Sequence, residues 1–375
     1  MTTTRTTSLS IVAALATSLG ASTGALADDV PSTSASEDMD APAPTRLRPV
    51  HFGLVPFGGE AEIDVHGVSF SLIADRVGRF SGVQGAPAIA QTLHSSRGVQ
   101  LSGVGNFVSG DLRGVQAGGA VNMTDGTVSG VQLTGGVNVA GRAVGVQLAP
   151  INLAGHTAGV QLGLVNVAWR HARGLQLGAV NVASRSRGFS FGLVNVAREH
   201  DGEAFGLLNF IGNGIHDVAV YSTDTMLTNA TVKLGGRHLY TSYSFGYTPG
   251  DKLSGANPTL ITGDHRRLGV GMGIGYRFDL DFGWLRFMEL EATGMAVQPE
   301  LDLSANDVPL LTAARAIVGI ELTRQLTLIA GVTENVSVAT NGRDLDLQQA
   351  GLEKVMRSGD TTVRIYPGVL LGLQL

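Results

Sequence analysis

Seven charged side chains in the C-terminal third of the sequence are the residues best suited to chemistry. They recur in long segments of alternating apolar and non-apolar residues, so we expect the interior of a sheet or barrel to collect them. There, Glu289 or Glu291 would act as a general acid or base, with His238 and Ser242 or Ser244 as a nucleophilic set. The seven residues are Arg277, Asp279, Glu289, Glu291, Arg315, Glu321 and Glu334.

The same charges have a simpler interpretation. Ionic groups inside a small filled barrel need partners, and mutual ion pairing and hydrogen bonding would supply them. No spacing rule singles out a nucleophile, an acid or a base among these residues. We therefore predict a protein that is not an enzyme and has no catalytic residues.

Motifs for cofactors and metals are missing from the sequence. The nine histidines are scattered without an H-x-x-x-H or H-x-H pair, and there is no cysteine, so the usual metal-ligand spacings do not occur. The glycine-rich run 271–275 lies within a strand-like segment, without the helix that receives a pyrophosphate in a dinucleotide site. We predict no cofactor and no metal, and we expect these glycines to leave room in a narrow barrel.

The segment 213–375 must position the charged residues. It contains about eight long alternating segments, such as 268–280, where Leu268, Val270 and Met272 share one face and glycines share the other. Apolar residues outside and glycine or charge inside are typical of an outer-membrane-type barrel of antiparallel strands. A soluble barrel or sandwich of the same strands is the alternative.

A short repeat fills the preceding segment, 49–212. Residues 159–168 read GVQLGLVNVA and residues 174–183 read GLQLGAVNVA. Such a period indicates units that bury their apolar faces only by stacking on one another. The leading glycines recur every 14 to 16 residues, at Gly53, Gly67, Gly82, Gly98, Gly114, Gly130, Gly145, Gly159, Gly174 and Gly188.

The repeats suit either a β-solenoid with two short strands per turn or a membrane barrel with one strand per period. Gln161 and Asn166 are five residues apart, whereas Gln132 and Asn138 are six apart. In a continuous strand the additional residue would turn everything beyond it to the other face, whereas a solenoid corner absorbs it. We therefore predict a solenoid of about ten turns at ~4.8 Å each, roughly 50 Å long.

Within each turn we expect the apolar residues to point inward, as for Val160, Leu162, Val165 and Val167, with Gly163 at a corner. The recurrent Gln and Asn side chains would form hydrogen-bond ladders between turns.

The polar runs between repeats are basic. Stacked in register they would form an edge that is either a solvated face blunting aggregation or a contact for lipopolysaccharide or anionic glycans, whose phosphates suit the planar guanidinium. The residues of this Arg-rich edge are Arg142, His156, Arg170, His171, Arg173, Arg185, Arg187 and Arg198.

The N-terminus indicates export. Residues 1–27 combine Arg5, an apolar stretch over 9–19 and an Ala25-Leu26-Ala27 cleavage site, the pattern of a signal peptide. Residues 28–48 are rich in Ser and Pro and acidic, which predicts a disordered linker or, alternatively, an acidic recruitment tail. After residue 27 no apolar run is long enough for a spanning helix, so a mature chain that spans a membrane would do so as a barrel.

The repeat units at Gly159, Gly174 and Gly188, followed by long strands from 215 to 375, resemble a family of bacterial surface-repeat proteins of spirochaetes and other Gram-negative bacteria. The resemblance implies an outer-membrane or cell-surface location and brings no catalytic residues.

We accordingly predict an all-β protein, a short-repeat β-solenoid followed by an antiparallel barrel, with a structural or interaction role. The repeats would be the display surface and the barrel the anchor. A whole-chain porin-like channel and a lipid-modifying outer-membrane enzyme are the alternatives. The net charge of −5 gives no reason to expect nucleic acid, and nothing in the sequence indicates an oligomeric state.

Overall fold

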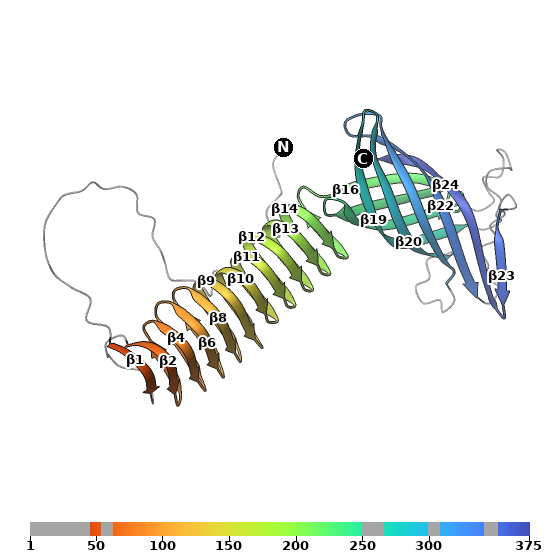
Figure 1. The fold of residues 1–375 in the computed structure, drawn as a ribbon. Helices are drawn as coiled ribbons and strands as arrows, with labels where there is room; N and C mark the ends of the chain where they lie inside the picture. The colour runs from red at the N-terminus through yellow and green to blue at the C-terminus, as the bar shows by residue number, and fades with distance from the viewer. Residues whose placement is uncertain (1–45, 54–62, 250–265, 299–307, 341–351) are drawn as a thin grey trace, which may run out of the picture. The chain divides into compact units, whose positions relative to one another are not determined.

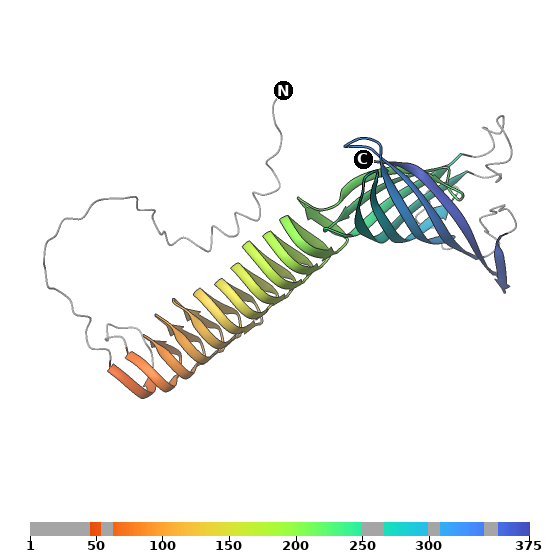
Figure 2. The ribbon, with the colours of Figure 1, turned by 45° about the horizontal axis from the view of Figure 1, so that its top comes forward.

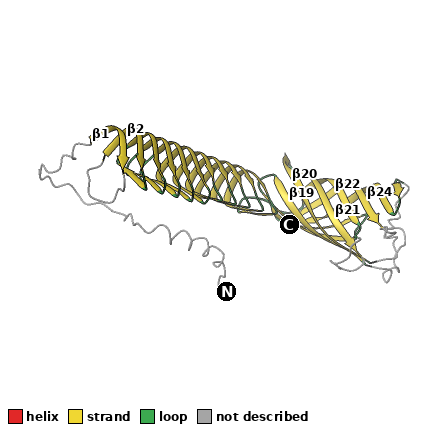
Figure 3. Cartoon of the chain, turned by 90° about the horizontal axis from the view of Figure 1, so that it is seen from below, coloured by secondary structure: helices red, strands yellow, loops and turns green. Residues whose placement is uncertain are grey.

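The computed structural model describes residues 46–53, 63–249, 266–298, 308–340 and 352–375. These residues are all-β, with 81% of the structure in strands, as the views from two sides show (Figures 1 and 3). Among them, no helix is long and apolar enough to cross a membrane. The predicted signal peptide, 1–27, and most of the predicted linker, 28–48, lie outside the described residues.

The first fold is the predicted β-solenoid, a parallel stack of about ten turns (Figure 2). Its first strand begins at Arg46, within the segment expected to be linker. Its strands are β1 (Arg46–Gly53), β2 (Ile63–Ser71), β3 (Ala74–Val77), β4 (Phe80–Ala86), β5 (Ile89–Thr92), β6 (Ser96–Ser102), β7 (Gly105–Val108), β8 (Leu112–Gly118), β9 (Val121–Thr134), β10 (Val137–Leu148), β11 (Ile151–Leu162), β12 (Val165–Leu177), β13 (Val180–Phe191), β14 (Val194–Phe205) and β15 (Leu208–Ile211).

The register of the stack places equivalent repeat positions next to one another. Gln132 pairs with Gln147 and Asn138 pairs with Asn152, although Gln and Asn are six positions apart in one turn and five positions apart in the next. The corner absorbs the difference, as the parity argument required. Gly163 lies at such a corner, where an added Cβ would be 2.0 Å from the carbonyl oxygen of Ala149.

The buried amides confirm the predicted ladders, but the prediction that the apolar residues of each turn point inward is wrong. Gln161 and Asn166 are fully buried, whereas Leu162 is 41% exposed and Val165 and Val167 are only half-buried. Val160 is half-buried as well. The interior accommodates the amides because the stacked Gln and Asn side chains hydrogen-bond to one another from turn to turn, which offsets the cost of burying a polar group.

The two ladders run in opposite directions. Gln161 donates from Nε2 to Oε1 of Gln147, toward the N-terminus, at 2.9 Å. Asn166 donates from Nδ2 to Oδ1 of Asn181, toward the C-terminus, at 2.9 Å, and also to the carbonyl oxygen of Leu177 at 2.8 Å. Asn166 therefore satisfies a corner carbonyl as well as its neighbour, and Asn122, Asn152, Asn181 and Asn195 do the same.

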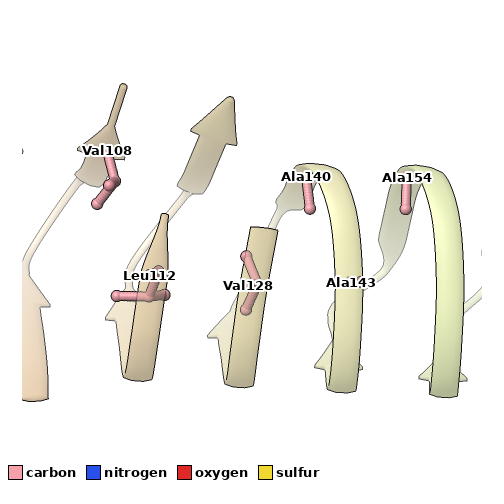
Figure 4. Packing of buried hydrophobic residues seen from close by; sticks show 6 residues of the cluster. All are labelled: Val108, Leu112, Val128, Ala140, Ala143 and Ala154. Atoms are coloured by element: carbon pink, nitrogen blue, oxygen red, sulfur yellow. The ribbon is translucent and has the colours of Figure 1, made fainter. Parts of the chain in front are cut away.

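The remaining interior is narrow and filled with small residues. One cluster consists of Val108, Leu112, Val128, Ala140, Ala143 and Ala154. Their side chains point into the turns, and large residues give way to alanine along the stack (Figure 4). The core of the solenoid is thus formed by two amide columns and a thin apolar strip.

Polar side chains close the Gln ladder at its N-terminal end and cap the backbone of the last turns at the other end of the solenoid. Gln84 donates to the buried carboxylate of Asp75 at 2.8 Å, and Ser69 and Ser71 donate to the same carboxylate at 2.7 Å each. At the other end, Asn213 accepts from the backbone N–H of His200 at 2.7 Å. The Asn213 amide replaces the next strand there, so the last turn is capped.

The second fold is a closed antiparallel barrel of eight strands, as predicted. The first and last wall strands, β16 and β24, pair and close it, and β23 adds to β24 outside the closed wall. The strands are β16 (His216–Thr223), β17 (Thr228–Gly235), β18 (Leu239–Thr248), β19 (Arg267–Phe282), β20 (Leu285–Gln298), β21 (Leu310–Glu321), β22 (Thr327–Thr340), β23 (Lys354–Ser358) and β24 (Thr361–Gln374).

The glycines of β19 make space for large interior side chains. A Cβ at Gly275 would lie 2.2 Å from Cζ of Tyr240, and one at Gly273 would lie 2.8 Å from Oγ of Ser242. Tyr240 is almost completely buried. The glycine run predicted to leave room in a narrow barrel has that role.

Gly159 provides a test of the stacking constraint. Its φ of +143° is unfavourable for an L-residue, and an added Cβ would lie 2.0 Å from the carbonyl oxygen of Gly145. Gly159→Ala should lower the free energy of unfolding of the solenoid by more than the ~1–2 kcal/mol expected from the backbone conformation alone. Urea unfolding of the full-length protein in detergent would measure this.

The matched control is Gly294→Ala, because a Cβ there would meet nothing within 4 Å. Equal stability of both variants and the wild type would contradict the stacking argument.

Candidate functional site

One edge of the solenoid stacks basic side chains in register. Arg142 pairs with His156, His156 with His171, and His171 with Arg185 in successive strands. The two imidazole rings are stacked, with centroids 5.2 Å apart and planes 12° apart. Partial burial, followed by the charges of His171, Arg170 and Arg142, lowers the pKa of His156. Four of the eight residues predicted for the Arg-rich edge therefore form a column, and Arg173 and Arg187 pair two positions further along their strands.

Acidic residues neutralise this edge toward its C-terminal end. Arg185 pairs with Glu199 at 2.9 Å, and Arg187 pairs with Asp201 at 3.5 Å. Within the described ranges, Arg142, Arg170 and Arg173 have no acidic partner. These three arginines lie on β10 and β12.

A second surface of the solenoid is apolar and lies around the opposite corner. Leu133, Leu148 and Leu162 form one exposed column in register, and Leu164 and Leu193 at the corner are 65% and 56% exposed. Contiguous exposed apolar surface of this kind is a candidate interaction surface. The solenoid thus has one apolar and one basic face.

The outer wall of the barrel is also apolar. Bulky side chains point outward from every wall strand, and Trp284 and Phe282 are exposed where β19 meets β20. An apolar outer band with aromatic residues at its rim is the pattern of a transmembrane barrel. Exposed members of the wall are Val218, Val220, Val232, Phe245, Tyr247, Val270, Met272, Ile274, Tyr276, Phe278, Leu290, Leu310, Val332, Val369, Leu371 and Leu373.

Inside the barrel, Glu289 is the centre of a charged network. Its carboxylate accepts from Nζ of Lys233 at 2.5 Å and from Nε of Arg277 at 2.8 Å. Arg277 also pairs with Asp217 at 2.5 Å, and Lys233 donates to Oε1 of Gln374 at 2.8 Å. The network joins four wall strands, β16, β17, β19 and β20, to β24.

Glu291 forms a second interior network two residues along β20. It accepts from Oγ of Ser242 at 2.5 Å and lies 3.5 Å from Nη1 of Arg315. Arg315 in turn donates to the hydroxyl of Tyr221 at 2.7 Å. Both carboxylates predicted as acids or bases are therefore fully engaged with cations and donors.

The nucleophilic set considered from the sequence is not assembled. His238 pairs with Glu203 of β14, at 2.7 Å between Nδ1 and Oε1, and not with either serine. Ser242 bonds Glu291, and Ser244 lies 2.7 Å from Oγ1 of Thr231. Among the described residues there is also no group of three His, Asp or Glu side chains arranged to hold a metal.

Three of the seven charged residues predicted to share the interior do not lie there. Asp279 and Glu321 are exposed at strand ends, where the wall no longer encloses the side chain. Glu334 is exposed on the outer wall, beside Ala314 and Pro367 of the neighbouring strands. Glu334 is two residues from Val332 on β22, so the two side chains share a face, and the alternation of the strand correctly predicts an outward position for Glu334.

Sequence reasoning missed Lys233, Asp217, Gln374 and Tyr221 as interior residues. The signal for Lys233 was present, because β17 alternates Ala230 and Val232 outward with polar residues inward. The partners of Lys233 depend on strand register across 141 residues, to Gln374, and no local pattern encodes that.

Comparisons with known proteins add no relative: no family model, no curated protein and no solved structure matches the chain.

His200 should make the solenoid sensitive to acid. It is 1% exposed, and burial, opposed by Glu203 and Asp201, lowers the pKa of His200 below its ordinary value of 6.5. Below about pH 6.5 the unfolded chain binds a proton that the folded chain does not, so the free energy of unfolding falls by ~1.4 kcal/mol per pH unit until the folded-state pKa is reached. Urea unfolding at pH 7.5 and 5.5 would show the decrease.

His200→Ser should reduce this pH dependence, since serine occupies the equivalent position in the preceding strand, at Ser186. His66→Ser is the control, because His66 is exposed. An unchanged pH profile in His200→Ser would refute the assignment.

Glu289→Gln should destabilise the barrel, because it leaves Lys233 and Arg277 buried with one carboxylate fewer. Removing one partner of a buried ionic network typically costs about 3–5 kcal/mol. The measurement is the temperature at which the compact barrel band disappears on SDS gels. Glu321→Gln, at an exposed strand end, should change stability by less than ~0.5 kcal/mol, and equal effects would contradict the proposed network.

Proposed function

We propose that this chain is an exported outer-membrane protein, in which the barrel is the anchor and the solenoid is a rigid surface for envelope structure or interaction. The observation that carries the proposal is the arrangement of the barrel, whose outer wall is apolar except at Glu334 and whose interior contains paired charges. In water such a wall would leave a large apolar surface exposed. In a bilayer the same wall would contact lipid hydrocarbon.

The solenoid suits an interaction role because its surfaces repeat. Equivalent positions stack about every 4.8 Å, so a basic or apolar column presents groups of similar chemistry at regular spacing along one line. A polymer or an extended surface can contact several turns together, and such multivalent binding is stronger than any single contact.

The proposed ligand of the basic edge is an anionic glycan, with lipopolysaccharide as one candidate. Arg142, Arg170 and Arg173 carry charge that is not neutralised by acids among the described residues. Arginine binds phosphate and carboxylate in bidentate geometry.

The channel alternative required the repeats to form part of the barrel wall. Instead, the repeat strands pair only with one another, and the barrel closes between β16 and β24 without them. Its interior contains side chains such as Tyr240, Tyr366 and Lys233, each at most 1% exposed. A wide channel formed by the whole chain is therefore not the architecture of this protein.

Membrane anchoring can be tested on the outer wall. Val332 is 63% exposed in the middle of β22, so Val332→Arg would place a charge in hydrocarbon at a cost of about 2–4 kcal/mol. We expect the wild type to resist carbonate extraction and to shift on boiling in SDS gels, and the variant to lose both properties in part. Ser358→Arg, on the short outer strand β23, is the control.

Extraction of the wild-type protein by carbonate would overturn the anchoring proposal, as would identical behaviour of both arginine variants.

Glycan binding can be tested with the variant Arg142→Gln/Arg170→Gln/Arg173→Gln. It should bind purified lipopolysaccharide more weakly, and the wild-type affinity should fall with added salt because exposed charges are screened. Arg185→Gln/Arg187→Gln removes two arginines that already have acidic partners and should have a smaller effect. Equal loss in both variants would indicate non-specific charge attraction and reject the edge as a site.

A further inference from the structure

We infer that the solenoid lies on the inner, periplasmic side of the outer membrane, so that its two faces meet partners inside the envelope. The inference rests on the proposed outer-membrane anchoring of the barrel. It comes from a difference between the two ends of the barrel, and it concerns the direction in which the repeats project.

The connections at the two ends of the barrel differ in length. At the end where β16 begins, successive strands are joined by 236–238, 283–284 and 322–326, and β24 finishes there. At the opposite end the connections are 224–227, 249–266, 299–309 and 341–360, the last of which contains β23. Three of these four are long, so one end has only short turns and the other has the long loops.

In bacterial outer-membrane barrels this asymmetry has a fixed orientation relative to the membrane. Their short turns face the periplasm, and their longer loops face the exterior. The end of this barrel where β16 begins is therefore the periplasmic end, and the end with the long connections is the outer one.

The solenoid is joined to the short-turn end by the chain itself. β15 finishes at Ile211 and β16 starts at His216, and so short a link, at most about 3.5 Å per residue, cannot cross a hydrocarbon core of roughly 30 Å. The repeats must therefore be on the side where β16 begins.

Hydrogen bonds between the solenoid and the barrel also place the solenoid at the short-turn end. Glu203 of β14 accepts from the backbone N–H of Leu239, the first residue of β18, at 2.9 Å. Thr241 donates to the carbonyl oxygen of Gly206 at 2.6 Å. In the link between β15 and β16, the backbone N–H of Ile215 donates to the carbonyl oxygen of Gly236 at 3.1 Å. Every one of these barrel residues lies at or next to the short-turn end.

This placement changes which anionic partner the basic edge can reach. Lipopolysaccharide in the outer leaflet would be on the other side of the membrane from Arg142, Arg170 and Arg173. An anionic polymer on the periplasmic side, such as a carboxylate-bearing cell-wall glycan, would be accessible to them. The solenoid then links the inner surface of the membrane to that polymer.

The absence of cysteine from the sequence permits a direct test by single-cysteine labelling of the full-length protein in cells. Three exposed positions report on the three regions: Ser129→Cys in the solenoid, Gln325→Cys in a short turn, and Ser358→Cys next to the tip of the β23–β24 hairpin. A membrane-impermeant maleimide is applied to intact cells and to cells with a permeabilised outer membrane. Carbonate extraction of each variant is measured in parallel.

We expect Ser358→Cys to be labelled in intact cells, and Ser129→Cys and Gln325→Cys to be labelled only after permeabilisation. Labelling of Ser129→Cys in intact cells overturns the inference, and so does a carbonate-resistant protein in which all three positions are shielded until permeabilisation. Loss of all three variants from carbonate-washed membranes instead overturns the anchoring proposal itself, so the two failures are distinguishable.

Discussion

Hydrogen bonding between identical amides one turn apart is the interaction on which the solenoid depends. Each buried Gln or Asn is satisfied only if the residue at the same position of the next turn is also an amide, or if a cap replaces it. This explains why Gln and Asn recur while the outward residues vary. It also explains why Asp75 lies where the Gln column begins, since its carboxylate accepts from Gln84 in place of a further amide.

The amide columns also set the size of the interior. Two columns of side chains from opposite strands leave only a thin space between them, which alanine fills in most turns. Because the turns stack so closely, the glycine column tolerates no Cβ, and its positive φ values continue to Gly202, one turn beyond the repeats recognised from their sequence. Gly202 was missed because Glu203 and Ala204 replace the hydrophobic residue and the Gln that normally follow.

The sequence was sufficient to predict the two folds but not which face of a repeat is inside. The variable spacing between Gln and Asn distinguished a solenoid from a barrel, because a corner can accommodate one additional residue whereas a continuous strand cannot. The assumption that apolar residues are buried then failed at Leu162, because a satisfied amide can be buried as readily as a leucine. In the barrel, alternation defined two faces correctly, yet the pairing of Lys233 with Glu289 follows from strand register, which is a property of the closed wall.

Because the solenoid is a stack of similar turns, its length is set by the number of turns. Each turn pairs only with the turn before and the turn after it, and equivalent positions stay in register through turns of 14 to 16 residues. Duplication of a single repeat would therefore lengthen the rod by one step of about 4.8 Å without altering either face or the barrel. The distance between the membrane and a bound partner is thus encoded in the number of repeats, and it can change in small, uniform increments as the gene gains or loses them.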